Sequence, residues 1–328
     1  MPEPSPTRPK RRGRLFRFGA ALLVLCGVAA YLVVQYVTGG GARGCKVVSS
    51  SGDGTSYEFT PEQAVNAATI AAVGTGRGMP ERAVTIALAT SLQESGLRNI
   101  EHGDRDSLGL FQQRPSQGWG TAQQIMDPAY AAGIFYAHLA KVPGYADLPL
   151  TEAAQEVQRS GYPEAYAKHE PDATLLAAAL TGRAAATLTC DGRQEPTDSA
   201  TGPDAVRAAL VRDFGRDALQ ETGAEVGGTP VPSPSPSPSV TATAQGQTVT
   251  VPVPQGTKVD AIGRGERERG WQVAQWAVAN SSALHIQRVS YAGREWTAGN
   301  GGQWKPASSD GADGAETSAG TVRIVTGQ

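Results

Sequence analysis

The pattern of apolar and polar positions predicts a series of helices between residues 59 and 185. In "TPEQAVNAATIAAV", Thr60 can cap a helix, Pro61 occupies its first position, and Gln63 follows three residues after the cap. "MPERAVTIALATSLQE" repeats the proline start, and its apolar residues recur at helical spacing over a face broad enough to be buried. No stretch in this range alternates convincingly like a strand. The pattern therefore predicts an all-α domain over residues 59–190.

Three more segments of this domain have helix signals. "DPAYAAGIFYAHLAKV" opens with Asp127 as a cap and Pro128 inside the helix. "TEAAQEVQRSG" is expected to end at Gly161. "YPEAYAKHEPDATLLAAALTG" is expected to be helical on both sides of Pro171.

The second half of the chain has a mixed pattern. "TGPDAVRAALVRDFGRDALQ" predicts one more helix, and "GERERGWQVAQWAVANSSAL" predicts another with its tryptophans turned inward. "QTVTVPV", "HIQRVSYAGREW" and "GTVRIVT" predict strands, the second of them as a strand, a turn and a strand. We expect a small α/β domain over residues 203–328.

A Pro/Ser-rich segment at about 222–246 interrupts this domain. Its core, "TPVPSPSPSPSV", favours extended polyproline conformation and cannot join a packed core. The segment is either a linker between domains or an insertion within the small domain. We favour the insertion, because the helix over 203–220 would otherwise have nothing to cover its apolar face.

The N-terminal region predicts a membrane anchor. Residues 18–37 contain no charge and are long enough to cross a bilayer as a helix, and residues 1–17 carry six basic residues and one acidic residue. Positive residues stay cytoplasmic, so a single-pass protein of the cell membrane is expected, with its bulk extracellular beyond a tether at 38–58. The alternative is a cleaved signal peptide, although the apolar stretch is long for one and its cleavage site is weak.

Charge and cysteine content fit an extracellular body. Without the first 37 residues, 23 of the 29 basic and 30 of the 31 acidic residues remain, which gives a net charge of −7. This balance argues against nucleic acid as a partner. Cys45 and Cys190 bracket the helical domain and most simply form a disulfide in an oxidising compartment, with two free thiols as the alternative. No cofactor is expected, and no metal, because neither cysteine has a partner at ligand spacing.

The chemistry is expected at the end of the second helix, in "SLQESGLRNIEHGDRDSLGLFQQ". Cleavage of a glycosidic bond needs a carboxylic acid that is still protonated near neutral pH, and a glutamate against apolar walls has its pKa raised. Glu94 is the candidate acid. Asp104 and Asp106 follow in a polar loop, and Gln112 and Gln113 offer amide groups to a glycan.

These motifs resemble the lysozyme-like superfamily, in the branch of goose-type lysozymes and soluble lytic transglycosylases. The resemblance covers roughly residues 60–182 and rests on Glu94-Ser95, on "GDR" at 103–105 and on "GLFQ" at 109–112, with Phe111 where the family has Met. The region around "GWGTAQQIMDPAYAAGIFYAHL" and "VQRSGYPEAYAKHE" is also similar to lysozyme-like domains of actinobacterial cell-wall proteins and phage lysins.

The resemblance implies that Glu94 is the general acid and that Asp104, with Asp106 behind it, is the candidate second carboxylate. It also implies a tyrosine near the acid, for which Tyr162 and Tyr166 are candidates. The goose-type pattern has a further Asp where this chain has Arg114, which weakens the case for hydrolysis. Lytic transglycosylases need only the glutamate.

Other candidate substrate-binding residues are Ser95, from the motif, and Trp119, which either stacks on a sugar or plugs the loop between two glycines. We therefore expect a peptidoglycan glycosidase that cleaves the MurNAc–GlcNAc β-1,4 bond, by transglycosylation or hydrolysis. Its partners would be peptidoglycan glycan strands and, through residues 18–37, the membrane. The alternative is a wall-binding or scaffold protein that keeps the fold without turnover.

Overall fold

The structure is a computed structural model that describes residues 44–192, 201–216, 247–253, 265–299, 302–307 and 320–327. Residues Arg43–Gln328 belong to one compact unit. Its helical part contains α2 (Pro61–Gly76), α3 (Glu81–Ser95), η1 (Pro115–Gln117), α4 (Ala122–Ile125), α5 (Pro128–Leu139), α6 (Leu150–Gln158), η2 (Pro163–His169) and α7 (Glu170–Leu180), where η marks a 3-10 helix.

The starts of the first helices follow the sequence signals. Thr60 caps α2 in a complete capping box, because its hydroxyl accepts from the Gln63 backbone N–H and the Gln63 side chain accepts from the Thr60 backbone N–H. Asp127 caps α5 through the backbone N–H groups of Ala129 and Tyr130. Both predicted caps are confirmed. α3 packs against α2, α5, α6 and α7, and this places its C-terminal end among the other helices.

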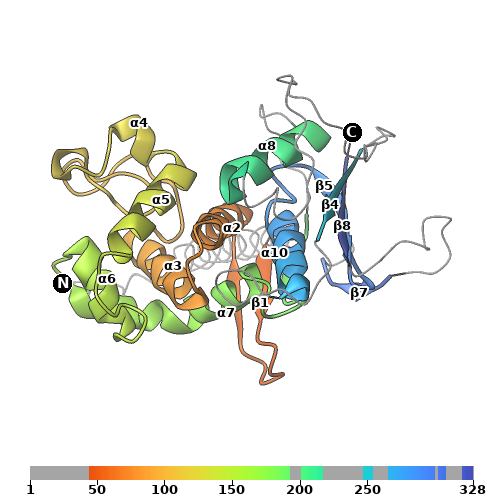
Figure 1. Ribbon diagram of the computed structural model, residues 1–328, viewed down its shortest axis with the longest axis horizontal. Helices are drawn as coiled ribbons and strands as arrows, with labels where there is room; N and C mark the ends of the chain where they lie inside the picture. Colours follow the sequence, from red (N-terminus) through yellow and green to blue (C-terminus); the bar gives the residue numbers. More distant parts are fainter. Residues whose placement is uncertain are drawn as a thin grey trace, which may run out of the picture. The chain divides into compact units, whose positions relative to one another are not determined.

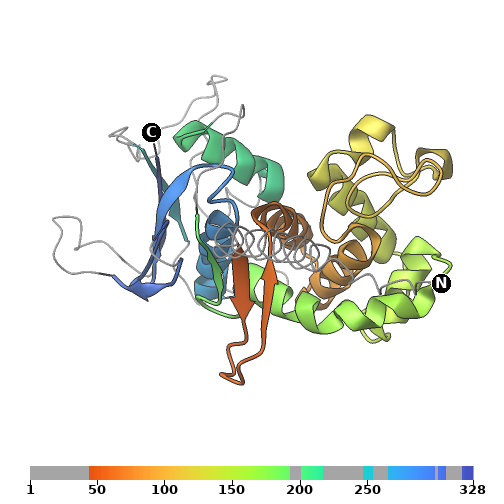
Figure 2. The ribbon, with the colours of Figure 1, turned by 180° about the vertical axis from the view of Figure 1, so that it is seen from behind.

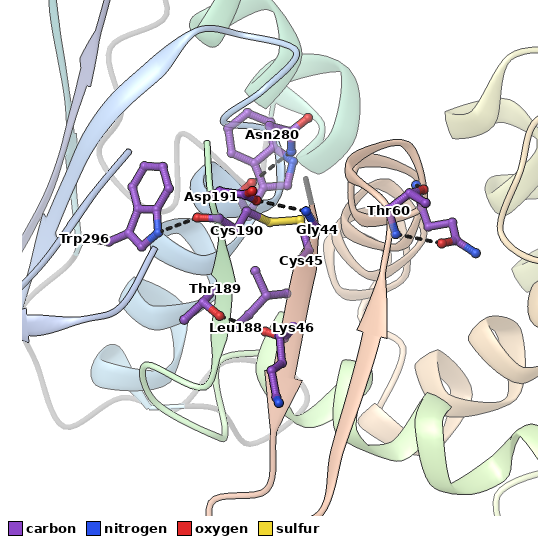
Figure 3. The surroundings of a disulfide bond; sticks show 12 residues. Gly44, Cys45, Lys46, Thr60, Leu188, Thr189, Cys190, Asp191, Asn280 and Trp296 are labelled. Atoms are coloured by element: carbon purple, nitrogen blue, oxygen red, sulfur yellow. Dashed lines mark hydrogen bonds between the residues drawn. A yellow bond between two sulfur atoms is a disulfide. The ribbon is translucent and has the colours of Figure 1, made fainter. Parts of the chain in front are cut away.

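A three-stranded antiparallel sheet accompanies these helices. Its strands are β1 (Cys45–Val48), β2 (Ser56–Phe59) and β3 (Leu188–Cys190), in the order β2-β1-β3. Cys45 and Cys190 are directly paired across β1 and β3, with their Cα atoms 4.0 Å apart, and they form the predicted disulfide (Figure 3). The bond joins positions 145 residues apart and closes the helical part of the chain into a loop.

The C-terminal part forms a second antiparallel sheet with two helices. The helices are α8 (Pro203–Phe214) and α10 (Glu266–Ala279). The strands, in sheet order, are β4 (Thr248–Pro252), β8 (Thr321–Thr326), β5 (Ile286–Tyr291), β6 (Arg294–Thr297) and β7 (Lys305–Pro306). Figures 1 and 2 show α10 between this sheet and α2, and α10 contacts both of them as well as α7 and β3.

The tryptophans of the C-terminal part are buried in this shared core. Trp271, Trp276, Trp296 and Trp304 are each less than 10% exposed. The Trp296 indole N–H donates to the Cys190 carbonyl at 3.1 Å, and that of Trp304 donates to the Leu188 carbonyl at 2.9 Å. Both bonds end on β3, so the tryptophans serve to join the C-terminal sheet to the helical part.

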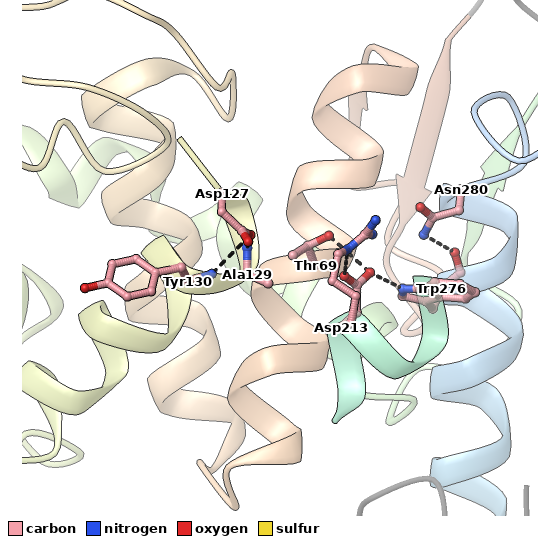
Figure 4. Close-up of polar contacts among 8 residues, drawn as sticks. Thr69, Asp127, Ala129, Tyr130, Asp213, Trp276 and Asn280 are labelled. Atoms are coloured by element: carbon pink, nitrogen blue, oxygen red, sulfur yellow. Dashed lines mark hydrogen bonds and ion pairs between the residues drawn. The ribbon is translucent and has the colours of Figure 1, made fainter. Parts of the chain in front are cut away.

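Two buried polar side chains strengthen the same junction. Asp213, on α8, is 1% exposed and accepts hydrogen bonds from Thr69 on α2 (3.2 Å) and from the Trp276 indole (2.8 Å), as Figure 4 shows. Gln275, on α10, donates to the carbonyls of Ala179 and Ala184, and its amide oxygen accepts from the N–H of the first residue of β3 and from that of the residue before it. Residues 44–192 and the C-terminal part therefore share one interior.

The predicted fold class needs correction. The described chain consists of helices and two antiparallel sheets within one compact unit, not an N-terminal transmembrane helix followed by a purely helical domain and a separate α/β domain. No helix within the described ranges is long and apolar enough to cross a membrane, and the span predicted at 18–37 lies outside those ranges. Residues 45–58, expected to belong to the tether, form most of the β1–β2 hairpin, and β3 pairs with β1 beside it.

Candidate active site

Glu94 lies in the last turn of α3, where the helix stops abruptly. Gly96 adopts a left-handed conformation (φ 64°), and its backbone N–H returns to carbonyls of the last turn. The Gly96 carbonyl accepts from the Gln63 side chain at 2.8 Å, and the Leu97 carbonyl accepts from the Asn66 side chain at 2.8 Å. The end of α3 is thus attached to α2, and this fixes the backbone that presents Glu94.

The Glu94 carboxyl group is partly buried, and Tyr166 is a close hydrogen-bond donor to it. The hydroxyl group of Tyr166 donates to its Oε1 atom at 2.7 Å. Burial raises the pKa of Glu94 above its ordinary value, and the hydrogen bonds of Tyr166 and Gln158 oppose this effect only in part. Tyr166 is fully buried, and burial together with the adjacent Glu94 raises its own pKa, so its hydroxyl stays protonated and donates. Glu94 therefore has the properties of a general acid.

The "GLFQQ" turn is fixed to the same end of α3. The Leu110 carbonyl accepts from the hydroxyl groups of Ser95 (2.8 Å) and Ser91 (3.1 Å). Gly109 has φ 74°, and a Cβ atom there would lie 2.7 Å from the carbonyl of Ile125, so only glycine fits. Ser95, predicted as a substrate-binding residue, is buried, and its hydroxyl is used in positioning this turn.

A cleft of about 660 Å³ opens beside Glu94. It lies between the loop that follows α3 and the end of α6, and α5 contributes one residue. Its lining is mostly polar and comprises Glu94, Asp104, Ser107, Gln112, Gln113, Arg114, Gln117, Trp119, His138, Glu156, Val157, Gln158, Arg159, Ser160, Gly161 and Tyr162. A polar cleft with aromatic side chains suits a glycan.

The two candidate aspartates have different surroundings. Asp104 lines the cleft, but its side chain is 92% exposed, and its nearest cation is Arg105 at 4.0 Å. Asp106 accepts from the Ser116 backbone N–H, from Arg114 and from the Ser116 hydroxyl at 2.9–3.0 Å. These bonds hold the pKa of Asp106 well below its usual range, and the bond from the Ser116 backbone N–H has the largest effect. Asp106 stabilises the loop in its ionised form, and only Asp104 faces the cleft.

The two glutamines both line the cleft, in different ways. Gln112 has a left-handed backbone (φ 49°), and its amide packs so close to Gly103 that no side chain would fit there. Gln113 is 2% exposed, and its amide N–H donates to the Ala131 carbonyl at 3.1 Å. Gln112 is therefore the more accessible of the two to a bound molecule.

The aromatic candidates separate into three positions. Trp119 lines the cleft and stacks on His138, with ring centroids 4.3 Å apart and planes inclined by 24°. Tyr162 also lines the cleft and is 78% exposed. Tyr166 lies behind the cleft and contacts Glu94, so it, rather than Tyr162, occupies the place of a tyrosine beside the acid.

The cleft also contains residues that were not predicted as site residues, among them His138, Gln158 and Arg159. Gln158 is the last residue of α6, and its side chain donates to the Phe111 carbonyl at 2.7 Å. Gln158 and Arg159 are polar residues at a predicted helix end in "VQRSG", which is a weak signal, but neither is a carboxylic acid, so the reasoning that selected Glu94 did not select them. His138 had no comparable signal, because its stacking on Trp119 depends on the tertiary fold.

Comparison with known proteins concerns the C-terminal part. Residues 238–317 match the family model described as VldE, C-terminal domain. No curated protein matches the chain. The match covers a minor part of the chain that includes β4, α10, β5, β6 and β7, and the cleft residues from Glu94 to Tyr162 lie outside it. The match is a likeness of this segment alone.

Proposed function

We propose that the cleft cleaves a β-1,4 glycosidic bond of peptidoglycan, with Glu94 as the general acid. The observation that carries the proposal is the Glu94 carboxyl group itself: partly buried at the cleft, with a raised pKa, and oriented by Tyr166 at 2.7 Å. A carboxyl group with these properties can remain protonated near neutral pH and donate its proton to a leaving oxygen. The resemblance of residues 60–182 to lysozyme-like enzymes supports the choice of substrate.

Of the two reactions, the geometry favours lytic transglycosylation. Direct hydrolysis with inversion needs a second carboxylate, held in place as the base for a water molecule. Asp106 is engaged by Arg114 and Ser116, and Asp104 is almost fully exposed without a hydrogen bond to hold it within the described residues. Glu94 would first protonate the glycosidic oxygen, and that C–O bond would break. Its carboxylate would then take the proton of the muramyl 6-hydroxyl group as that oxygen bonds to C1.

The Cys45–Cys190 disulfide supports a location where peptidoglycan is found. Disulfides persist in oxidising compartments and are rare in the cytosol. We propose that residues 44–328 act on the outer side of the cell membrane.

The test is the release of fragments from purified peptidoglycan by the full chain. We expect release by the wild-type protein, loss of release in Glu94→Gln, and no loss in Glu62→Gln, which removes an exposed carboxylate from the first turn of α2. Equal release by wild type and Glu94→Gln would refute the assignment of Glu94. If the wild-type protein binds peptidoglycan but releases no fragments, the proposed glycosidase activity is refuted and the domain is a wall-binding module.

A further inference from the structure

Arg159 differs from the other basic residues near the cleft. It lines the cleft, it is exposed, and its side chain forms no hydrogen bond or ion pair with the described residues. Arg114, by contrast, is bonded to Asp106 at 2.9 Å. Arg159 is therefore a cation of the cleft lining that no acidic side chain among the described residues neutralises.

The backbone of Arg159 is held in a conformation that its side chain disfavours. It ends α6 with φ 51° and ψ 42°, in the left-handed region, and its backbone N–H donates to the Gln155 carbonyl at 2.8 Å. Glycine or asparagine is the usual residue there, and another residue costs about 1 kcal/mol. Because Gln158 is bonded to the Phe111 carbonyl, the conformation of Arg159 is fixed relative to the turn beside Glu94.

We infer that Arg159 binds a carboxylate on the glycan, so that the cleft selects an anionic polysaccharide over a neutral one. The inference rests on the proposed function and adds a residue that determines its specificity. A guanidinium group recognises carboxylates through paired N–H donors, and it remains charged at every physiological pH. In peptidoglycan strands without stem peptides, the carboxylate would belong to the lactyl group that distinguishes N-acetylmuramic acid from N-acetylglucosamine.

Glu156 provides a contrast of opposite sign within the same helix. It lies one turn before Arg159 on α6, it is exposed, and it also lines the cleft. A carboxylate at that position repels an anionic glycan. Neutralising Glu156 should therefore improve binding of the anionic glycan, whereas neutralising Arg159 should weaken it.

The experiment compares two soluble glycans: peptide-free peptidoglycan strands with free lactyl carboxylates, and neutral N-acetylglucosamine oligomers of similar length. Dissociation constants are measured at low and high salt for the full chain carrying Glu94→Gln, so that turnover does not interfere. The variants added to this background are Arg159→Asn, which suits the left-handed backbone, Arg159→Lys, which keeps the charge, and Lys168→Gln as the matched control, an exposed cation on η2 that does not line the cleft.

Arg159→Asn should weaken binding of the anionic strands by roughly five-fold, as expected for an accessible ion pair, and leave the neutral oligomers unchanged. Arg159→Lys should retain most of the affinity, Lys168→Gln should change neither glycan, and high salt should remove the difference. Equal weakening for both glycans, or no change for either, would overturn the inference. Binding is measured without catalysis, so the two proposals can fail independently. If the protein does not cleave peptidoglycan, the proposed function is refuted, whereas the role of Arg159 is decided by the glycan-binding comparison alone.

Discussion

Replacing Tyr166 by Phe tests the link between the buried hydroxyl group and the acidity of Glu94. The substitution removes one oxygen atom from a fully buried ring, so packing changes little. It also removes the O–H donor that lies 2.7 Å from Glu94 Oε1. A hydrogen bond to a charged group contributes about 1.5–3 kcal/mol in favour of the ionised form.

The sign and size of the effect follow from this bond. Since the bond stabilises the carboxylate, it lowers the pKa of Glu94, and burial remains the larger, opposing cause. Without the bond, the protonated form persists to higher pH, so the alkaline limb of the activity profile should move upward by about one pH unit, because about 1.4 kcal/mol corresponds to one unit. The plateau rate should fall by roughly ten-fold, because the carboxyl group loses its orientation.

Two measurements detect the change: the dependence of kcat/KM on pH, followed by release of soluble peptidoglycan fragments, and the titration of the Glu94 carboxyl carbon by NMR. Tyr162→Phe is the matched control, since that hydroxyl lies at the exposed rim, and it should leave the alkaline limb in place whatever it does to the rate. An alkaline limb that stays in place, or moves to lower pH, in Tyr166→Phe would refute the reasoning.

Three other predictions concern stability. Because folding raises the pKa of Glu94, its ionised form destabilises the folded protein, and Glu94→Gln should raise the Tm at pH 7. This gain should disappear as the pH falls below the ordinary pKa of glutamate. A lower Tm of the variant at pH 7 would contradict the prediction. Asp213→Ala leaves the buried Trp276 indole without an acceptor and should cost about 3 kcal/mol in urea unfolding, whereas a cost below about 1 kcal/mol would show that α8 is not held by this network. Replacing Cys45 and Cys190 by Ser should lower the free energy of unfolding by about 5 kcal/mol at most, which is the chain-entropy contribution for a loop of this length. An unchanged free energy of unfolding would mean that the disulfide does not form in solution.

The sequence predicted the helices well because their signals are local. The caps at Thr60 and Asp127 depend on residues within three positions, and both are present in the structure. The predicted strands of the C-terminal part are also present, as is the buried face of α10. In each case a short window of sequence contains the decisive contacts.

The features that the sequence missed depend on contacts between distant residues. The β1–β2 hairpin looked like a tether because a Ser- and Gly-rich turn dominates its composition, while its stability comes from pairing with Leu188–Cys190. Asp106 was a candidate behind Asp104, but its oxygens accept hydrogen bonds from Arg114 and from the Ser116 backbone N–H, which the sequence does not reveal. The C-terminal tryptophans reach the backbone of β3, so the two halves share an interior that no local pattern predicts.

The masses of the products released from peptidoglycan test the central claim most directly. If Glu94 acts as the only catalytic carboxyl group, the wild-type chain should release fragments that end in 1,6-anhydro-muramic acid, each lighter by one water molecule than a hydrolysis product. Asp104→Asn should release the same fragments at a similar rate, and Glu94→Gln should release none. Reducing ends from the wild type that disappear in Asp104→Asn would contradict the account and assign the second carboxylate to Asp104.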